Sequence, residues 1–497
     1  MTDLRSLVIE SSRRHGLGGV AAAIVAKGER PVVECVGVAD RASGRRVSQD
    51  TVFQIASISK TLTAVGLMQL HDQAGFRLDD PVNHYLKGLR IERPPGGAEV
   101  TFRHLLTHTS GIGELPRVAD VVRSEAWGVG PPFSRPPDLA DLYRGALRTE
   151  VAAGSKWAYA NHGFAILGKL VADISGVSFV EYMRERVLRP LGMADTDCVR
   201  TARVAGELAT GYHWIRNRFA RVTDRDIILL GPGSVLSSLR DMARYCGWLL
   251  GDRRHASGDV LASETLREMM STQFAVDVRL GTSMGLAFFL DRFGTHRVCG
   301  HDGNNPGFAS ALLVAPDDGV GVVVMTNTST FIGAHLLAAS VLRAQLGLTD
   351  PADVVTRGDI PARPHVWPAL TGCYAPRPGF LTNARLWQTV GGEVEVCVRD
   401  KRLFMRALSP ISQLRRGVEL HATDDADPLL FALSIEGLVV EVAFATNDAG
   451  RVDRVCIGAP AMATLHRRPA WRSSRRRLAV VGASGLAMAA IECARRR

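Results

Sequence analysis

Hydrophobic residues in the first part of the chain follow two periods, one typical of strands and one of helices. Residues 20–25 and 31–38 are short runs of strand-forming residues on either side of a glycine-containing turn, which predicts an antiparallel hairpin. Apolar residues recur every three to four positions over 58–73, so a helix is expected there. Gly75 follows closely and is predicted to cap the C-terminal end of that helix.

The same two periods continue to residue 345. Further helices are predicted at 163–174, 179–187, 239–250 and 334–345, and strands at 309–315 and 319–326. The last strand is apolar at nearly every position, which is typical of a strand buried on both faces. A proline-rich stretch at 130–137 is predicted to be a long loop; whether it covers a site or is a plain surface loop stays open.

The composition changes beyond this first domain, which is predicted to span 1–348. Prolines accumulate and apolar runs become rare over 349–368, which predicts a linker. Over 369–466 short β-like segments alternate with Gly, Asp and Pro turns, so a small all-β domain is expected. Residues 467–497 are predicted to form a basic, weakly apolar tail.

The formal net charge of +10 is concentrated in this tail. Residues 466–497 contain nine arginines and one acid, Glu492, so the rest of the chain is close to neutral. The composition therefore predicts no basic surface for a nucleic acid. The apolar run at 478–491 is short for a membrane span. Two interpretations of the tail stay open: peripheral contact with an anionic membrane surface, or a solvated terminus.

The overall composition excludes several protein classes. A hydrophobic fraction of 46% with 22% charged residues is typical of a folded globular protein and not of a disordered or polytopic membrane chain. The eight cysteines are scattered singly without a C-x-x-C pair, which argues against a zinc site and favours free buried thiols over four disulfides. The first 14 residues lack an apolar core, so no secretory signal and a cytoplasmic location are expected.

The first candidate for chemistry is Ser57-Ile58-Ser59-Lys60 at the start of the helix expected over 58–73. Residues three apart share one face of a helix, so Lys60 can reach the hydroxyl of Ser57. A serine hydroxyl is a weak nucleophile that needs an adjacent base, and a lysine can supply one when its surroundings lower its pKa. Taken alone, S-x-x-K is a weak signal because such tetrapeptides also arise by chance.

Two later motifs add polar groups of the kinds that such a serine needs. Tyr159-Ala160-Asn161 offers a proton shuttle and an amide that can hold a substrate carbonyl, although a loop tyrosine beside a helix cap fits equally well. His301-Asp302-Gly303-Asn304 precedes the strand expected at 309–315, and a glycine there lets a substrate approach the strand edge. The next backbone amide can serve as an oxyanion donor.

The order and spacing of these three motifs resemble the serine β-lactamase-related hydrolases, which include class C β-lactamases, D-alanyl-D-alanine carboxypeptidases, D-aminopeptidases and family VIII esterases. Supporting stretches are similar to that family as well, and they lie at 51–56, 77–81, 103–112, 231–234 and 237–244. The resemblance covers roughly residues 4–346. It implies an α+β, β-lactamase-like fold in which helices flank an antiparallel sheet and form a helical subdomain, here followed by the all-β module.

The resemblance also implies a role for each matching residue. Ser57 is expected to be the nucleophile, Lys60 its activator and Tyr159 the general acid and base, with Asn161 orienting the substrate. His301, Gly303 and Asn304 occupy the third motif, in which the backbone amides of Ser57 and Asn304 are expected to form the oxyanion hole. The reaction is acyl transfer through a covalent acyl-enzyme on a small ester or amide substrate. It is complete with side chains, so neither a metal nor an organic cofactor is implied.

Two departures from the family pattern bear on the substrate. Asp302 stands where the family more often has Thr or Gly, and a carboxylate facing the site would repel an anionic substrate. His301 replaces the lysine that the family often has. Together with the expected location, these departures favour an esterase, then a D-peptidase or amidase, then a β-lactamase. An acyltransferase and a catalytically silent binding protein remain alternatives, and the oligomeric state stays unknown.

Other reactive residue types lie near these motifs. His104 and His108 are predicted to be hydrogen-bonded structural histidines, since the matching segment of the family is structural. Cys299 is expected to be a packed thiol, and Asp79 and Asp80 are expected to form a turn rather than a metal site.

Overall fold

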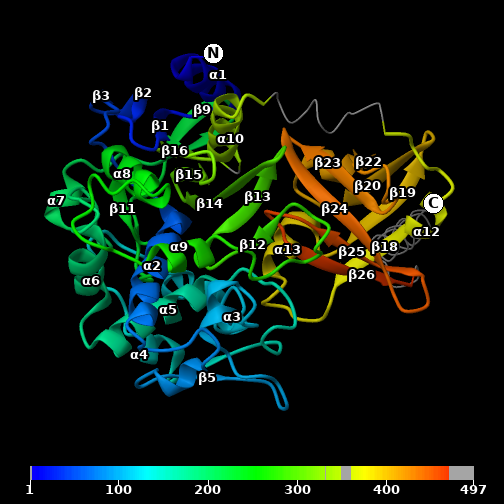
Figure 1. Ribbon diagram of the computed structural model, residues 1–497, viewed down its shortest axis with the longest axis horizontal. Helices are drawn as coiled ribbons and strands as arrows, with labels where there is room; N and C mark the ends of the chain where they lie inside the picture. The colour runs from blue at the N-terminus through cyan, green and yellow to red at the C-terminus, as the bar shows by residue number, and fades with distance from the viewer. Residues whose placement is uncertain (1–2, 331, 349–359, 470–497) are drawn as a thin grey trace, which may run out of the picture. The chain divides into compact units, whose positions relative to one another are not determined.

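A computed structural model describes residues 3–330, 332–348 and 360–469 of the chain (Figure 1). Most of the predicted linker at 349–368, and all but the first three residues of the predicted tail at 467–497, lie outside the described residues. Two compact units are present: Met1–Ala275 with Gly281–Asp350, and Val276–Leu280 with Pro351–Arg497.

An eight-stranded antiparallel sheet forms the centre of the first unit, in the order β12-β13-β14-β15-β16-β1-β2-β3 (Figure 1). The strands are β1 (Gly19–Ala26), β2 (Val32–Asp40), β3 (Arg45–Arg46), β12 (Ser283–Met284), β13 (Phe289–Phe293), β14 (His296–Asn305), β15 (Phe308–Ala315) and β16 (Val320–Thr326). β1 and β2 confirm the predicted hairpin. β1 also pairs with β16, with Val20 opposite Thr326, so both ends of the unit meet in one sheet.

Helices cover both faces of this sheet (Figure 1). α1 (Leu4–His15) and α10 (Gly333–Gln345) pack on one face, where Leu337 shares a core with Val322. α8 (Leu239–Leu249) packs on the opposite face against β16 and β1. β16 is buried along its whole length, which confirms the expectation from its apolar sequence.

A helical region carries much of the remaining core of the first unit. α2 (Ser59–Asp72) packs against α5 (Asn161–Ser175), which also contacts α3 (Phe102–Leu106) and α6 (Phe179–Tyr182). The other helices are α4 (Leu139–Tyr143), α7 (Ala202–Ala205), α9 (Ser263–Met269), η1 (Ala56–Ile58), η2 (Val82–His84), η3 (Val118–Val122), η4 (Ser124–Trp127) and η5 (Met183–Leu188). Within the described residues no single helix has the length and apolar character to cross a membrane; α5 and the 179–188 segment meet that test only as a pair bent by 81°.

Short strands connect these elements to the sheet. They are β4 (Val52–Gln54), β5 (Arg90–Glu92), β6 (Val129–Gly130), β7 (Ala146–Arg148), β8 (Tyr212–Ile215), β9 (Arg218–Arg221), β10 (Asp226–Ile227), β11 (Leu236–Ser238) and β17 (Thr328–Ser329). The antiparallel pair of β4 and β11 leads directly into η1 and α8, respectively. This pair therefore links the chain before Ser57 to the start of α8.

The helix predicted over 58–73 is present, but its C-terminal end differs from the expectation. The left-handed conformation falls on Ala74, with φ 57°, and not on Gly75. The Gly75 N–H donates to the carbonyl of Leu70 at 2.9 Å. A Cβ at Gly75 would lie 2.8 Å from that oxygen, so this glycine serves close approach rather than a positive φ.

The second unit is a nearly closed antiparallel sheet of nine strands, in the order β21-β20-β19-β18-β26-β25-β24-β23-β22. The strands are β18 (Gly372–Pro376), β19 (Val394–Arg399), β20 (Arg402–Ala407), β21 (Val418–Glu419), β22 (His421–Ala422), β23 (Leu430–Ile435), β24 (Leu438–Thr446), β25 (Val452–Ile457) and β26 (Ala463–Arg468), with helices α12 (Trp367–Leu370), α13 (Ala384–Val390) and α14 (Ser412–Arg416). Tyr374, Val442 and Phe444 lie in its core. The predicted α+β organisation with an all-β C-terminal part is confirmed.

The second unit also contains a segment from an earlier part of the chain. Val276–Leu280 belongs to it, although the residues on either side belong to the first unit. Arg279 pairs with Asp427 at 3.0 Å, and Leu280 packs with Ala443 and Cys456. The all-β unit therefore includes chain segments on both sides of the region that the sequence assigned to the linker.

Candidate active site

Ser57 lies on η1, the single turn between β4 and the long helix α2. The residue before it, Ala56, has φ 49°, a left-handed conformation that costs an alanine about 1 kcal/mol. Two side chains hold this turn: Ser59 Oγ donates to the Ala56 carbonyl at 2.6 Å, and Ser310 Oγ donates to the Ile55 carbonyl at 2.8 Å. The half-buried Ser57 side chain is thus presented by a fixed turn.

Lys60 is completely buried one turn after Ser57. Its Nζ donates to Ser57 Oγ at 2.9 Å, to Asn161 Oδ1 at 2.9 Å and to the Pro232 carbonyl at 2.7 Å. An ammonium has three N–H donors, so these three acceptors match its capacity. The contact to Ser57 is within the range for direct proton transfer. Three segments distant in the sequence thereby meet at one amine.

Tyr159 lies just before α5, with its ring centroid 4.8 Å from Lys60 Nζ. His108 packs against the tyrosine ring with a centroid separation of 4.2 Å, and its Nδ1 accepts the Ala160 N–H at 3.2 Å. His108 is therefore hydrogen-bonded and structural, as predicted. Its contacts also place Tyr159 beside Lys60.

His104 lies in the first turn of α3 and has a structural role. Thr101 and His104 form a reciprocal capping box at the start of α3, in which the Thr101 side chain accepts from the His104 backbone and the His104 side chain accepts from the Thr101 backbone. Burial lowers the pKa of His104. This histidine is hydrogen-bonded and structural, as the sequence predicted, and its contact caps a helix.

The third motif lies on β14, and its glycine packs against the turn that holds Ser57. A Cβ added at Gly303 would lie 2.2 Å from the carbonyl oxygen of Ile55 and 2.3 Å from Ser310 Oγ. Only glycine fits there without moving backbone. Asn304 follows directly, opposite Ala309, and is exposed. The predicted third motif and the predicted nucleophile are therefore neighbours in the structure.

His301 and Asp302 lie on opposite faces of β14. His301 is 3% exposed, its ring centroid is 5.1 Å from that of Phe289 and 6.2 Å from that of Tyr159, and so it belongs to the side of Ser57 and Lys60. Asp302 instead pairs with His335 of α10 at 3.0 Å. The Asp302 carboxylate faces away from the side of Ser57 and Lys60, so it is not placed to repel an anionic substrate there.

Two contacts within the candidate site were not predicted from the sequence. Gln54 Oε1 accepts from Asn305 Nδ2 at 3.0 Å, which ties β4 to the end of β14. The other new contact is the Pro232 carbonyl on Lys60. Gln54 and Pro232 both lie in stretches that resemble the family, but a backbone carbonyl has no residue-type signal.

The remaining residues singled out from the sequence lie in ordinary structural settings. Cys299 is buried, and burial raises the pKa of its thiol to about 12. The seven described cysteines are not in disulfides, as expected. Asp80 accepts the Arg77 N–H at 2.8 Å in a turn, and Asp79 pairs with Arg103 at 2.8 Å. The described residues contain no cluster of three or more His, Cys, Asp and Glu side chains arranged for a metal ion.

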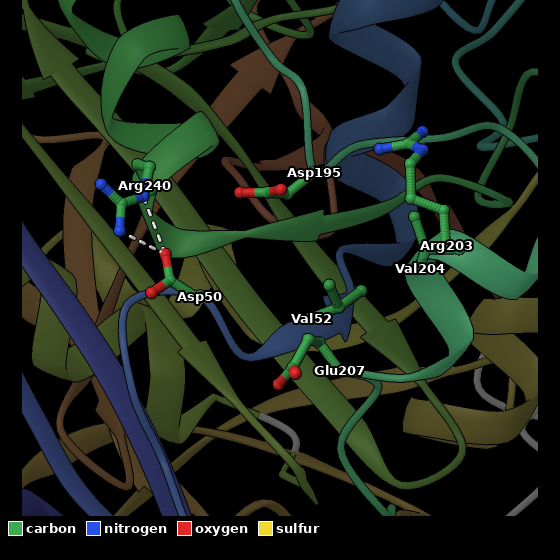
Figure 2. A pocket seen from close by; sticks show the side chains of 7 residues that line it. All are labelled: Asp50, Val52, Asp195, Arg203, Val204, Glu207 and Arg240. Atoms are coloured by element: carbon green, nitrogen blue, oxygen red, sulfur yellow. Dashed lines mark hydrogen bonds and ion pairs between the residues drawn. The ribbon is translucent and has the colours of Figure 1, made fainter.

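A surface pocket of about 380 Å³ opens next to β4 and α7 (Figure 2). It is lined by Asp50, Val52, Asp195, Arg203, Val204, Glu207 and Arg240. Figure 2 shows Arg240 paired with Asp50, at 2.5 Å. None of the predicted site residues lines this pocket, so it is separate from the cluster around Ser57.

Comparisons with known proteins show the family and the fold of the chain. The chain matches the β-lactamase family model over residues 4–346. The D-alanyl-D-alanine-carboxypeptidase/endopeptidase AmpH of Escherichia coli is 25% identical over 340 residues, covering 63% of this chain and 81% of the relative. Penicillin-binding protein 4 of Amycolatopsis lactamdurans is 31% identical over 329 residues, with the same coverage. The octameric penicillin-binding protein homologue from Pyrococcus abyssi shares the fold, with a TM-score of 0.60 at 22% identity over 93% of this chain and 99% of that one.

Proposed function

Since this chain belongs to the β-lactamase family of serine hydrolases, we propose that it cleaves a carboxylic ester or amide through an acyl-enzyme on Ser57. The observation that carries the proposal is the 2.9 Å contact between the buried amine of Lys60 and the Ser57 hydroxyl. The proton with which Lys60 donates to Ser57 must first leave the nitrogen; the neutral amine can then accept the hydroxyl proton at this distance as the serine oxygen attacks. Ser57 is then the nucleophile and Lys60 its activator.

Proton transfer in the proposed reaction involves Lys60 and Tyr159 together. The Ser57 oxygen bonds to the substrate carbonyl carbon while its proton passes to this pair. The bond to the leaving alcohol or amine then breaks, and Tyr159 protonates the leaving atom. A water molecule then attacks the acyl carbon and gives one proton to the pair, the bond from that carbon to the Ser57 oxygen breaks, and the pair returns the proton to Ser57 as the acid departs. Tyr159 suits this role because its ring lies 4.8 Å from Lys60 Nζ and a phenol can both donate and accept.

The remaining polar groups of the site have roles in binding. The backbone amides of Ser57 and Asn304 are proposed to bind the oxyanion, and Gly303 supports this assignment because it brings β14 against η1. Loss of one such donor typically raises the barrier by about 3 kcal/mol. Asn161 accepts from Lys60 through Oδ1, so its amide nitrogen can orient the substrate carbonyl.

An ester is our preferred substrate because of His301. An imidazole is a cation only when protonated, whereas the lysine often found at this position in the family carries a permanent charge at neutral pH. A site with His301 therefore depends less on a substrate carboxylate. The rings of Phe289 and Tyr159, whose centroids lie 5.1 Å and 6.2 Å from that of His301, suit an apolar group.

A D-amino-acid peptidase is the second candidate, and one observation favours it. Asp302 faces α10, so its charge does not oppose a substrate carboxylate near His301. AmpH, which is similar over 81% of its own length, is named as a carboxypeptidase and endopeptidase. A β-lactam remains the third candidate substrate.

The test is fluorophosphonate labelling combined with hydrolysis of p-nitrophenyl butyrate, D-alanyl amides and nitrocefin. Wild type is expected to label and to cleave the ester fastest, and Ser57→Ala is expected to lose both activities. Ser43→Ala, at an exposed turn, is the matched control and should behave as wild type. If only the D-alanyl amides are cleaved, the preference for an ester substrate is wrong and the D-amino-acid peptidase is the better assignment.

Two further results would revise the proposal. A wild type that neither labels nor cleaves any of these substrates would contradict the enzyme assignment and favour a silent binding protein. Faster ester turnover on addition of an alcohol or amine, with the acyl group found on that acceptor, would instead identify an acyltransferase.

A further inference from the structure

A contact between His335 and Asp302 lies on the face of β14 opposite to that of His301 and Gly303. His335 Nδ1 is 3.1 Å from Asp302 Oδ1 and 3.0 Å from Oδ2, and the two side chains are 22% and 37% exposed. Successive residues of a strand face opposite sides, so Asp302 points to α10 while His301 and Gly303 point to the side of Ser57. The pair thus connects α10 to the part of β14 that carries the motif.

The charges around His335 favour its protonated form. Burial alone disfavours the imidazolium, but Asp302 on β14 and Asp291 on β13 outweigh burial and raise the pKa of His335, against an opposing effect of Arg343 on α10. Asp291 is itself desolvated, and burial raises the pKa of its carboxyl group. When His335 is protonated, its contact with Asp302 is an ion pair, which is stronger than a neutral hydrogen bond.

The same strand carries a second pair of the same chemistry. At the other end of β14, His296 Nδ1 lies 2.7 Å from Asp318 Oδ1, and both side chains are about as exposed as His335. Six residues separate His296 from Asp302, which is about 20 Å along a strand. Each pair therefore consists of one histidine and one aspartate, with one of the two residues on β14. The two pairs differ in their distance from the motif that packs against the Ser57 turn.

We propose that Asp302 and His335 are positioning residues for the reaction at Ser57, because their ion pair fixes His301, Gly303 and the Asn304 amide against η1. The inference rests on the proposed function. Loss of the His335 proton removes the charge from one partner and loosens this end of β14. A misplacement of about 1 Å at a reacting group can lower a rate about 100-fold. Activity should therefore fall as the pH rises through the titration of His335.

The test is the pH profile of kcat and KM for p-nitrophenyl butyrate, with wild type, Asp302→Asn and His335→Gln. In wild type we expect an alkaline decrease in kcat that both variants lack. At pH 6.5 each variant should lower kcat about tenfold with KM changed less than twofold. The double variant should be no slower than either single variant, because both remove one interaction. His335→Lys keeps the positive charge, so it should restore kcat and remove the alkaline decrease.

The matched controls are His296→Gln and Asp318→Asn, which break the distant pair. They should retain the wild-type kcat and pH profile, with melting temperatures measured for all variants to separate rate from stability. A wild-type rate and profile in Asp302→Asn or His335→Gln would overturn the inference, as would equal losses from the distant pair. If either result is obtained and wild type still shows Ser57-dependent turnover, the positioning role is refuted and the proposed function is retained. If wild type shows no such turnover, both the positioning role and the proposed function are refuted.

Discussion

The imidazole of His108 lies against the ring of Tyr159, and the same imidazole binds the backbone N–H of Ala160. The carbonyl of His108 also accepts the N–H of Ala158. One histidine thereby holds the tyrosine and both of its neighbours. His108 has φ 58°, a left-handed conformation that is uncommon for a residue with a side chain. We interpret it as the support that places Tyr159 beside Lys60.

Replacing His108 should therefore slow the reaction as well as weaken the fold. His108→Ala is expected to lower the free energy of unfolding by about 2 kcal/mol, for one buried hydrogen bond and one ring contact. It should also lower kcat about tenfold, because Tyr159 loses its support. His104→Ala, which removes a helix cap, should lower the melting temperature and leave kcat unchanged. Equal kcat in the two variants would contradict the supporting role.

Removing the amine of Lys60 should stop acylation without unfolding the protein. Lys60→Met is expected to lower the rate of fluorophosphonate labelling about 1000-fold, since a positioned base contributes 10²- to 10⁴-fold. Folding should be retained, because removal of a buried cation also removes the free-energy cost of keeping its charge away from water. The control is Lys169→Met, which removes only a pair with Asp173 on α5. An unfolded Lys60→Met would mark the lysine as structural.

A methyl group at Gly303 should separate β14 from the serine turn. The Cβ of Gly303→Ala would overlap the Ile55 carbonyl, which is backbone and cannot rotate away. We expect kcat/KM to fall about 100-fold, the loss that a shift of about 1 Å can produce. In Gly206→Ala the new Cβ has no neighbour closer than 4.0 Å, so activity should be retained. Comparable kinetics in the two variants would show that close approach of β14 is not required.

Asp241 should make the fold more stable at mildly acidic pH than at neutral pH. Burial raises the pKa of its carboxyl group to about 6, despite hydrogen bonds from Thr196 and the Asp195 backbone. Between about pH 4 and 6 the folded state holds a proton that the unfolded state has lost, so stability falls as the pH rises through this window, by at most about 3 kcal/mol.

The measurement for Asp241 is urea unfolding of wild type and Asp241→Asn at pH 4.5, 5.5 and 7. The amide does not titrate, so the stability difference between the two proteins should change with pH in favour of wild type at pH 4.5. A difference that stays constant from pH 4.5 to 7 would refute the raised pKa.

The sequence alone predicted most of the longer helices and the residues that the structure brings together around Ser57. The three-residue spacing of Ser57 and Lys60 places both on one helical turn, whatever the rest of the chain does. The strand β14 was not predicted from the sequence, and in the structure its alternation places His301 and Gly303 on one face. Hydrophobic periods located the hairpin and α2 because these signals lie within a few neighbouring residues. The C-terminal end of α2 differed from the prediction. The left-handed residue there is Ala74, and Gly75 instead allows close approach to the carbonyl of Leu70.

Only the tertiary structure decided which distant groups act on these residues. The carbonyl of Pro232 on Lys60, the ring of His108 on Tyr159 and the imidazole of His335 on Asp302 all come from other segments. Their positions depend on how helices pack on the sheet, and local periodicity does not encode that packing. The direction of Asp302 illustrates the difference. From its residue type alone, the Asp302 carboxylate was expected to repel an anionic substrate if it faced the site. Its contact with α10 shows that it faces away.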